Sequence, residues 1–142
     1  MSAFAAVLDT LQNDAQLAAI LTGGLYSGLE MSDITRQSAP AAFDEFAEMR
    51  PCGLLKVETV TPWGPHPDTA REYLVLWLYA QRDVAAINTA RERAYRLLHR
   101  QQLSTAAGIF DVRHADDVVA IEVAALDVPA IASRFVATVN RG

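Results

Sequence analysis

The 142-residue sequence predicts one α+β domain over residues 1–142, with a mostly antiparallel sheet of four to five strands and two helices packed on one face. Two segments, 3–21 and 83–102, carry apolar residues at helical spacing. Strand-like runs lie between and after them, and the last three follow one another directly. Because consecutive strands mostly pair with each other, this order favours an antiparallel sheet.

The first helix is predicted over residues 3–12, and Asp14 is expected to cap a short continuation that runs through Leu21. Gly23 and Gly24 then end it, since glycine readily adopts the left-handed conformation that stops helices. The apolar positions that recur at helical spacing are Phe4, Val7, Leu8 and Leu11.

Two long loops are predicted, at about 27–50 and 61–70. The first has no clean period and mixes Ser, Asp, Pro and Glu, with a helical turn expected over 42–49. The second contains "TPWGPHPD", whose three prolines and one glycine favour a loop. Loops of this length in a small domain are often functional.

The remaining strands are predicted from the alternation of apolar and polar residues, and the remaining helix from its capping residue. "CGLLKVETV" (52–60) alternates as a half-buried strand does, and "REYLVLWLYA" (71–80) is apolar on both faces, as expected of a central strand. Asp83 is expected to cap a helix that runs to about Gln102. Three strands, "GIFDVRH", "VVAIEVAAL" and "SRFVATVN", follow, with a turn at "HADD" and a break at Pro129.

Composition excludes several classes of protein. The net charge of −5 argues against a dedicated nucleic-acid binder. The longest apolar stretch, "LVLWLYA", is far shorter than the roughly 20 residues that span a membrane. The N-terminus lacks the pattern of a signal peptide. We therefore expect a protein made in a host cytoplasm, with no membrane partner.

The soft metal ligands do not form a recognisable site. They are Cys52, His66, His99 and His114, and no two stand at zinc-site spacing. We expect Cys52 to be a small buried residue, and the competing enzyme hypothesis pairs it as a nucleophile with His66 or His114. No phosphate loop or nucleophile elbow occurs. The sequence predicts no cofactor, no metal and no catalytic activity.

Arginines and one tryptophan are the candidate assembly residues. Arg82, Arg93, Arg96 and Arg100 share one helix face, either solvated or directed at an acidic partner or a nucleic-acid backbone. Arg91 falls within the apolar face, so it either snorkels at the rim or pairs with a carboxylate across a subunit interface. Trp63, in the proline-rich loop, is either a contact residue or a lid over the sheet. Trp77 is expected in the core.

Four segments carry a resemblance to a known family. They are "LQNDAQLAAILTGGLYSG", "PAAFD" with "RPCGLLKVETVTPWGP", "EYLVLWLYAQRD" leading into "INTARERAYRLLH", and "ALDVPAIASRFVATV". Together they resemble the tail-terminator and head–tail joining (neck) proteins of long-tailed bacteriophages. The resemblance implies a virion protein that forms a homo-oligomeric ring, commonly a hexamer. It also implies contacts with the tail-tube protein and with a head connector or adaptor, and a lumen through which DNA passes without sequence-specific binding.

Three alternatives remain beside this interpretation. The first alternative is a head-completion adaptor bound to the portal. The second is a small cysteine-dependent enzyme that uses Cys52, and the third is a nucleic-acid-binding module that uses the arginine row. A ring of identical head-to-tail contacts needs two different surfaces on each subunit, and the two loops are expected to supply them. The negative net charge suggests a lumen that repels DNA, whereas an arginine-lined lumen contradicts this idea.

Overall fold

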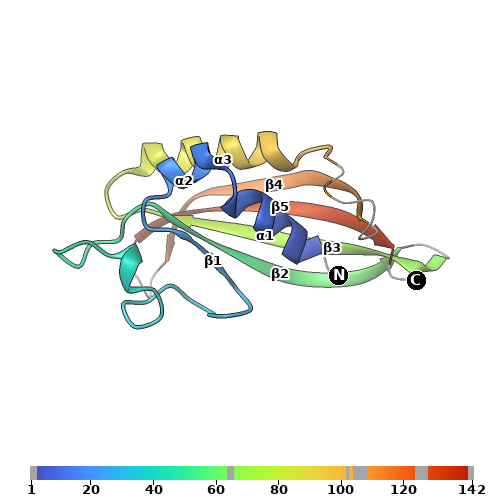
Figure 1. The fold of residues 1–142 in the computed structure, drawn as a ribbon, viewed down its shortest axis with the longest axis horizontal. Coiled ribbons are helices and arrows are strands. Elements are labelled where there is room, and N and C mark those ends of the chain that lie inside the picture. The colour runs from blue at the N-terminus through green and yellow to red at the C-terminus, as the bar shows by residue number, and fades with distance from the viewer. Residues whose placement is uncertain (1–2, 64–65, 102, 104–108, 124–127, 141–142) are drawn as a thin grey trace.

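The structure of the chain is a computed structural model that describes residues 3–63, 66–101, 103, 109–123 and 128–140. For residues 63, 66–68, 109–110 and 119–123 it describes the backbone alone. Within these residues the α+β prediction is confirmed. Five strands form one mostly antiparallel sheet, with two long helices and one short helix on the same face (Figure 1).

The chain begins with α1 (Ala3–Gln12) and α2 (Ala15–Ile20), as the sequence predicts. Asp14 has an extended backbone, and its carboxylate accepts a hydrogen bond of 2.9 Å from the N–H of Leu17, which caps α2. At the start of α1, the N–H of Ala3 donates to the buried carboxylate of Glu72 at 2.8 Å. At each helix start, one backbone donor is therefore satisfied by a carboxylate.

A short strand, β1 (Leu25–Ser27), precedes a long irregular segment. This strand, which the sequence did not predict, pairs in parallel with residues 53–55. Residues 28–51 then form turns and bends around the 3₁₀ helix η1 (Pro40–Ala42). The helical turn predicted over 42–49 is wrong. Residues 43–49 form a tight reversal closed by a bridge between Phe43 and Met49.

A long hairpin, β2 (Cys52–Trp63) and β3 (His66–Tyr79), forms the middle of the sheet. The prediction of a loop at 61–70 is therefore wrong for the described residues. Two of its prolines, Pro62 and Pro67, lie where one side of their strand has no neighbouring strand to pair with. Pro62 lies beyond the stretch of β2 that β1 covers, and Pro67 lies beyond Thr69, where the pairing of β3 with β5 begins.

The helix α3 (Val84–Leu98) begins at Asp83, whose side chain caps it as predicted. It ends earlier than the predicted Gln102, because the chain turns to pair with the sheet edge. Arg100 adopts a left-handed backbone with φ 61°, and its N–H donates to the carbonyl of Val112 at 2.7 Å. The N–H of Val112 donates back to Gln101 at 3.1 Å.

Two long strands, β4 (Ile109–Val123) and β5 (Val128–Asn140), complete the sheet in the order β1-β2-β3-β5-β4. The predicted turn at "HADD" is wrong. The strand runs through it and bends at register shifts, one of them between His114 and Asp116. Pro129 also does not break the chain but lies inside β5.

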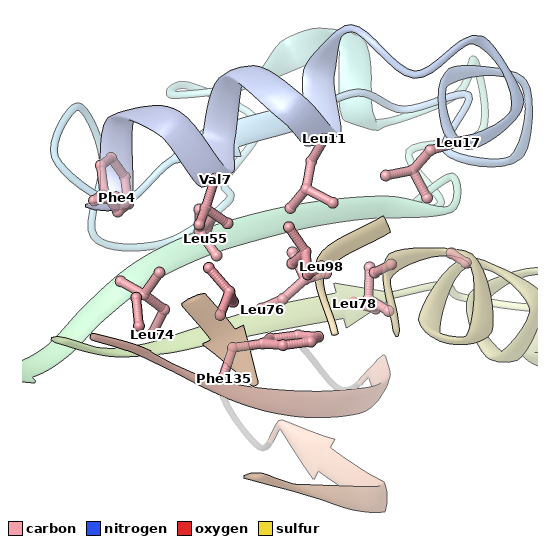
Figure 2. Close-up of a cluster of buried hydrophobic side chains, with 14 of the residues drawn as sticks. Phe4, Val7, Leu11, Leu17, Leu55, Leu74, Leu76, Leu78, Leu98 and Phe135 are labelled. Carbon is pink, nitrogen blue, oxygen red and sulfur yellow. The ribbon is translucent and has the colours of Figure 1, made fainter. Parts of the chain in front are cut away.

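The main core lies between the helices and one face of the sheet. Figure 2 shows Phe4, Val7 and Leu11 of α1 directed at side chains of the sheet, and all the labelled residues are buried. A second cluster covers one end of the other face, where the 28–51 segment packs on the sheet. Its central members are Ile34, Ala42, Met49, Cys52, Leu54 and Tyr79. Trp77, predicted in the core, is only partly buried at its margin.

Candidate assembly surfaces

The predicted arginine row is divided between internal ion pairs and exposed side chains. Arg82 pairs with Glu48 through Nε and Nη2, which ties the start of α3 to the 28–51 segment. Arg93 holds Asp14 with two hydrogen bonds, 2.9 Å from Nε and 2.8 Å from Nη2. The second pair joins α3 to the cap of α2, so both arginines stabilise the fold of their own chain.

The other two arginines of the row, Arg96 and Arg100, have exposed side chains. Arg96 borders a surface hollow of about 360 Å³ with Arg91, Glu92, Tyr95, His114 and Asp117. Arg82 is also largely exposed, with 80% of its side-chain surface accessible, although Glu48 pairs with it. Arg93, whose side chain is 29% exposed, is the arginine of the predicted row that the fold covers most.

Arg91 pairs with a carboxylate of its own chain. Its Nη1 donates to Asp117 Oδ2 at 2.9 Å. Its Nε is buried and has no hydrogen-bond partner among the described residues. The carboxylate expected across a subunit interface is therefore supplied by β4.

Trp63 is the last residue of β2, and its backbone pairs with that of His66 at the end of the hairpin. The side chain of Trp63 lies outside the described part of the structure. The choice between a contact residue and a lid therefore stays a prediction.

Asp117 is the centre of a polar cluster beneath α3 that the sequence did not reveal. Its Oδ1 accepts from Ser133 Oγ at 2.6 Å and lies 2.8 Å from His114 Nε2, while its Oδ2 binds Arg91. Since an ionised carboxylate can only accept, Nε2 of His114 carries the proton. The cluster joins α3, β4 and β5.

The carboxyl of Asp117 stays ionised in this partly buried site. Burial raises its pKa, but the hydrogen bonds from Ser133, His114 and Arg91, together with the charge of His114, outweigh it. The net effect lowers the pKa below 3.8. The negative charge therefore stabilises the fold at neutral pH.

The aspartate, histidine and serine do not form a catalytic triad. In a triad the serine hydroxyl bonds the imidazole, which in turn bonds the carboxylate. Here Ser133 and His114 both bond the same oxygen of Asp117. Ser133 is also fully buried, so a substrate cannot reach its hydroxyl. The arrangement suits a structural role, in which Asp117 holds α3, β4 and β5 together.

Cys52 lies fully buried in the second cluster, as the sequence predicts, and burial raises the pKa of its thiol to about 12. Neither proposed histidine partner reaches it. His66 pairs with Trp63, eleven residues along β2 and so about 35 Å away at about 3.3 Å per residue. The ring of His114 packs on Phe135 of the main core, on the opposite face of the sheet. This geometry does not support a cysteine nucleophile.

The sheet face opposite the helices is open beyond the 28–51 segment. A shallow hollow of about 410 Å³ there is lined by Arg71, Tyr73, Asp111, Arg113, Val136 and Thr138. The charges on this face compensate one another. Arg113 binds Asp111 at 2.8 Å, and Arg134 lies 3.6 Å from Glu58 and 3.7 Å from Asp116.

Among the described residues, no group of three or more acidic, histidine or cysteine side chains is placed to bind a metal ion. In the same part of the chain, no helix is long and apolar enough to cross a membrane.

The chain matches no protein-family model and no curated protein. Comparison with solved structures finds a chain described as part of the virion of a native gene transfer agent particle. The match has a TM-score of 0.74 at 20% sequence identity, and it covers 98% of this chain and 95% of that one. The chain shares its fold with a virion protein. Because the match is end to end, it includes the 28–51 segment and the long hairpin as well as the core.

Proposed function

We propose that this chain is a structural protein of a phage-type virion, a tail terminator that forms a ring at the head-proximal end of the tail. The observation that carries the proposal is the end-to-end fold match with a chain of a gene transfer agent virion. The resemblance of the sequence to tail-terminator and neck proteins points independently to the same class.

The proposed role needs no chemistry. Cys52 is buried with a raised thiol pKa, and the Asp117 cluster holds its serine out of reach of a substrate. We propose that the chain is not an enzyme and that it requires no cofactor.

The proposed ring contacts the tail-tube protein on one side and the head connector or adaptor on the other, and DNA passes through its lumen. The net charge of −5 favours a lumen that does not retain DNA. The pairing of Arg82 and Arg93 with carboxylates of their own chain leaves less positive charge to line it.

The test is the effect of the purified protein on polymerisation of the matching tail-tube protein, followed by electron microscopy. We expect shorter tubes, each closed at one end by a ring. Tubes of unchanged length with bare ends, even at excess protein, would contradict the terminator role. Binding to isolated portal complexes instead of tubes would favour the head-completion adaptor.

A further inference from the structure

A phenylalanine on the surface of the 28–51 segment is unusually exposed. Phe46 is 76% exposed, although large aromatic side chains usually gain stability from burial. It stands at the tip of residues 43–49, which we call the Phe46 turn. A single exposed apolar residue is common on protein surfaces. The rigidity of this turn is what distinguishes Phe46.

Several independent contacts hold the Phe46 turn in one conformation. Asp44 Oδ1 accepts from the N–H of Phe46 at 2.9 Å and from the N–H of Glu48 at 3.0 Å. The N–H of Asp44 donates to the carbonyl of Glu48 at 2.9 Å, and the Glu48 side chain is held by Arg82. Between them Ala47 has a left-handed φ of 62°, which costs energy in a residue with a Cβ.

This conformation presents Phe46 to solvent, where its ring gains little from burial within its own chain. Strained backbone that its surroundings hold in place is typical of functional sites. A backbone already held in its bound conformation also loses less entropy on binding, which favours tight contacts.

The same chain carries an apolar hollow of suitable size. The α1–α2 hollow, of about 260 Å³, lies between these two helices and β1. It is lined by Leu11, Gln12, Leu17, Ala18, Leu21, Gly24 and Leu25. Since an apolar cavity of about 150 Å³ can hold a benzene ring, this hollow has room for a phenyl side chain.

We propose that Phe46 of one copy inserts into the α1–α2 hollow of a neighbouring copy and forms the subunit contact of the ring. This inference rests on the proposed function. Phe46 cannot fill the hollow of its own chain, because it stands in solvent. The two features are different surfaces of one subunit, so their contact is heterologous and repeats from copy to copy, as ring closure requires.

Disulfide trapping tests the contact directly, even where the ring is short-lived in solution. The test variant carries Glu45→Cys and Ala18→Cys, because Glu45 is an exposed neighbour of Phe46 and Ala18 is an exposed residue that lines the hollow. Phe46 itself is kept, so the contact can form. The control carries Leu29→Cys and Ala18→Cys. Leu29 belongs to the same segment and, like Phe46, is 76% exposed. The native Cys52 is fully buried, so it does not compete.

After mild oxidation, we expect a ladder of dimers, trimers and larger species on a non-reducing gel for the test variant only. The largest closed species gives the number of subunits in the ring. Equal ladders for test and control would overturn the inference. So would a product that stops at dimers, since it would indicate a reciprocal pair.

Single substitutions on either side of the proposed contact give a second measurement, the strength of self-association. We expect Phe46→Ala to weaken self-association by roughly 30-fold or more, as at binding hot spots, whereas Leu29→Ala leaves it unchanged. Ala18→Trp should fill the hollow and block association. Ala19→Trp, at an exposed position of α2 outside the hollow, should not.

Mixing the two blocked variants then tests whether the contact is head to tail. A Phe46→Ala copy keeps its hollow and an Ala18→Trp copy keeps its phenylalanine, so the mixture should form dimers and nothing larger. No association in the mixture would overturn the inference.

The experiments can contradict the inferred contact and the proposed function independently of each other. If the wild type caps tubes with rings but the test variant gives no ladder, the contact is wrong and the terminator role stands. If the ladder forms but tubes are never capped, the contact stands and the terminator role fails.

Discussion

Removal of the Asp117 carboxylate should destabilise the protein strongly, because it leaves two partners without an acceptor. Asp117→Ala would leave the Arg91 guanidinium and the buried Ser133 hydroxyl without their acceptor. Loss of one partner of a fully buried ion pair costs about 3–5 kcal/mol. An orphaned buried hydroxyl costs about 1–3 kcal/mol.

The expected loss is smaller than the sum of these values, because the Asp117 and Arg91 side chains are 17% and 26% exposed. We expect about 3 kcal/mol for Asp117→Ala, or about 10 °C in Tm for a chain of this size. Asp117→Asn should cost about half as much, because its amide oxygen can still accept from Ser133.

The matched control is Asp116, the neighbouring acidic residue on the opposite face of the sheet. Its side chain is 55% exposed, and it lies 3.7 Å from Arg134. Removal of such an exposed pair should cost below about 1 kcal/mol. Urea denaturation at neutral pH measures each loss. Equal losses for Asp117→Ala and Asp116→Ala would refute the view that the cluster clamps α3 to the sheet.

The same cluster predicts a dependence on pH. Since the pKa of Asp117 is lowered in the folded state, its stabilisation is present above the unfolded value near 3.8 and is lost as the pH falls through the folded value. The stability difference between the wild type and Asp117→Asn should therefore shrink below about pH 4. A difference that stays constant down to pH 2 would contradict this assignment.

Three further predictions concern other parts of the fold. Asp14→Ala should cost about 1–2 kcal/mol in urea denaturation, because it removes the cap of α2 together with the partner of Arg93. Arg93→Ala keeps the cap and should cost less than Asp14→Ala. Cys52 should resist alkylation in the folded protein at pH 8 and react at once in urea; fast labelling of the native protein would show that the thiol is accessible. Gly28→Ala should lower Tm by several degrees, because a Cβ at this position would lie 2.8 Å from the carbonyl oxygen of Leu55. An unchanged Tm would show that β1 can shift to make room for the methyl group.

Local pattern predicts the helices of this protein well. The apolar spacing over 3–12 and the capping side chains of Asp14 and Asp83 are short-range signals, and each is used in the structure. The end of α3 is different. It depends on the pairing of Arg100 with Val112, a long-range contact that local spacing does not contain.

The strand predictions fail where tertiary context overrides local propensity. Proline and aspartate usually mark turns, so "TPWGPHPD" and "HADD" favour loops. In the fold, Pro62 lies at a sheet edge where no donor is needed. Asp117 lies within β4, where Ser133, His114 and Arg91 satisfy its carboxylate.

The assembly residues could be foreseen only in part. A helical wheel places the arginines on one face, but it cannot show that Asp14 and Glu48 neutralise two of them, because these partners lie far away in the sequence. Phe46 lies in an acidic stretch without period, and its exposure depends on how the 28–51 segment packs on the sheet.

The most direct test of the central proposal is a cryo-electron microscopy reconstruction of tail tubes assembled with this protein. We predict a closed ring of copies of this chain at one end of each tube, with Phe46 of every copy beside α1 and α2 of the next. Tube ends without added density, while the protein stays in the unbound fraction, would contradict the terminator role.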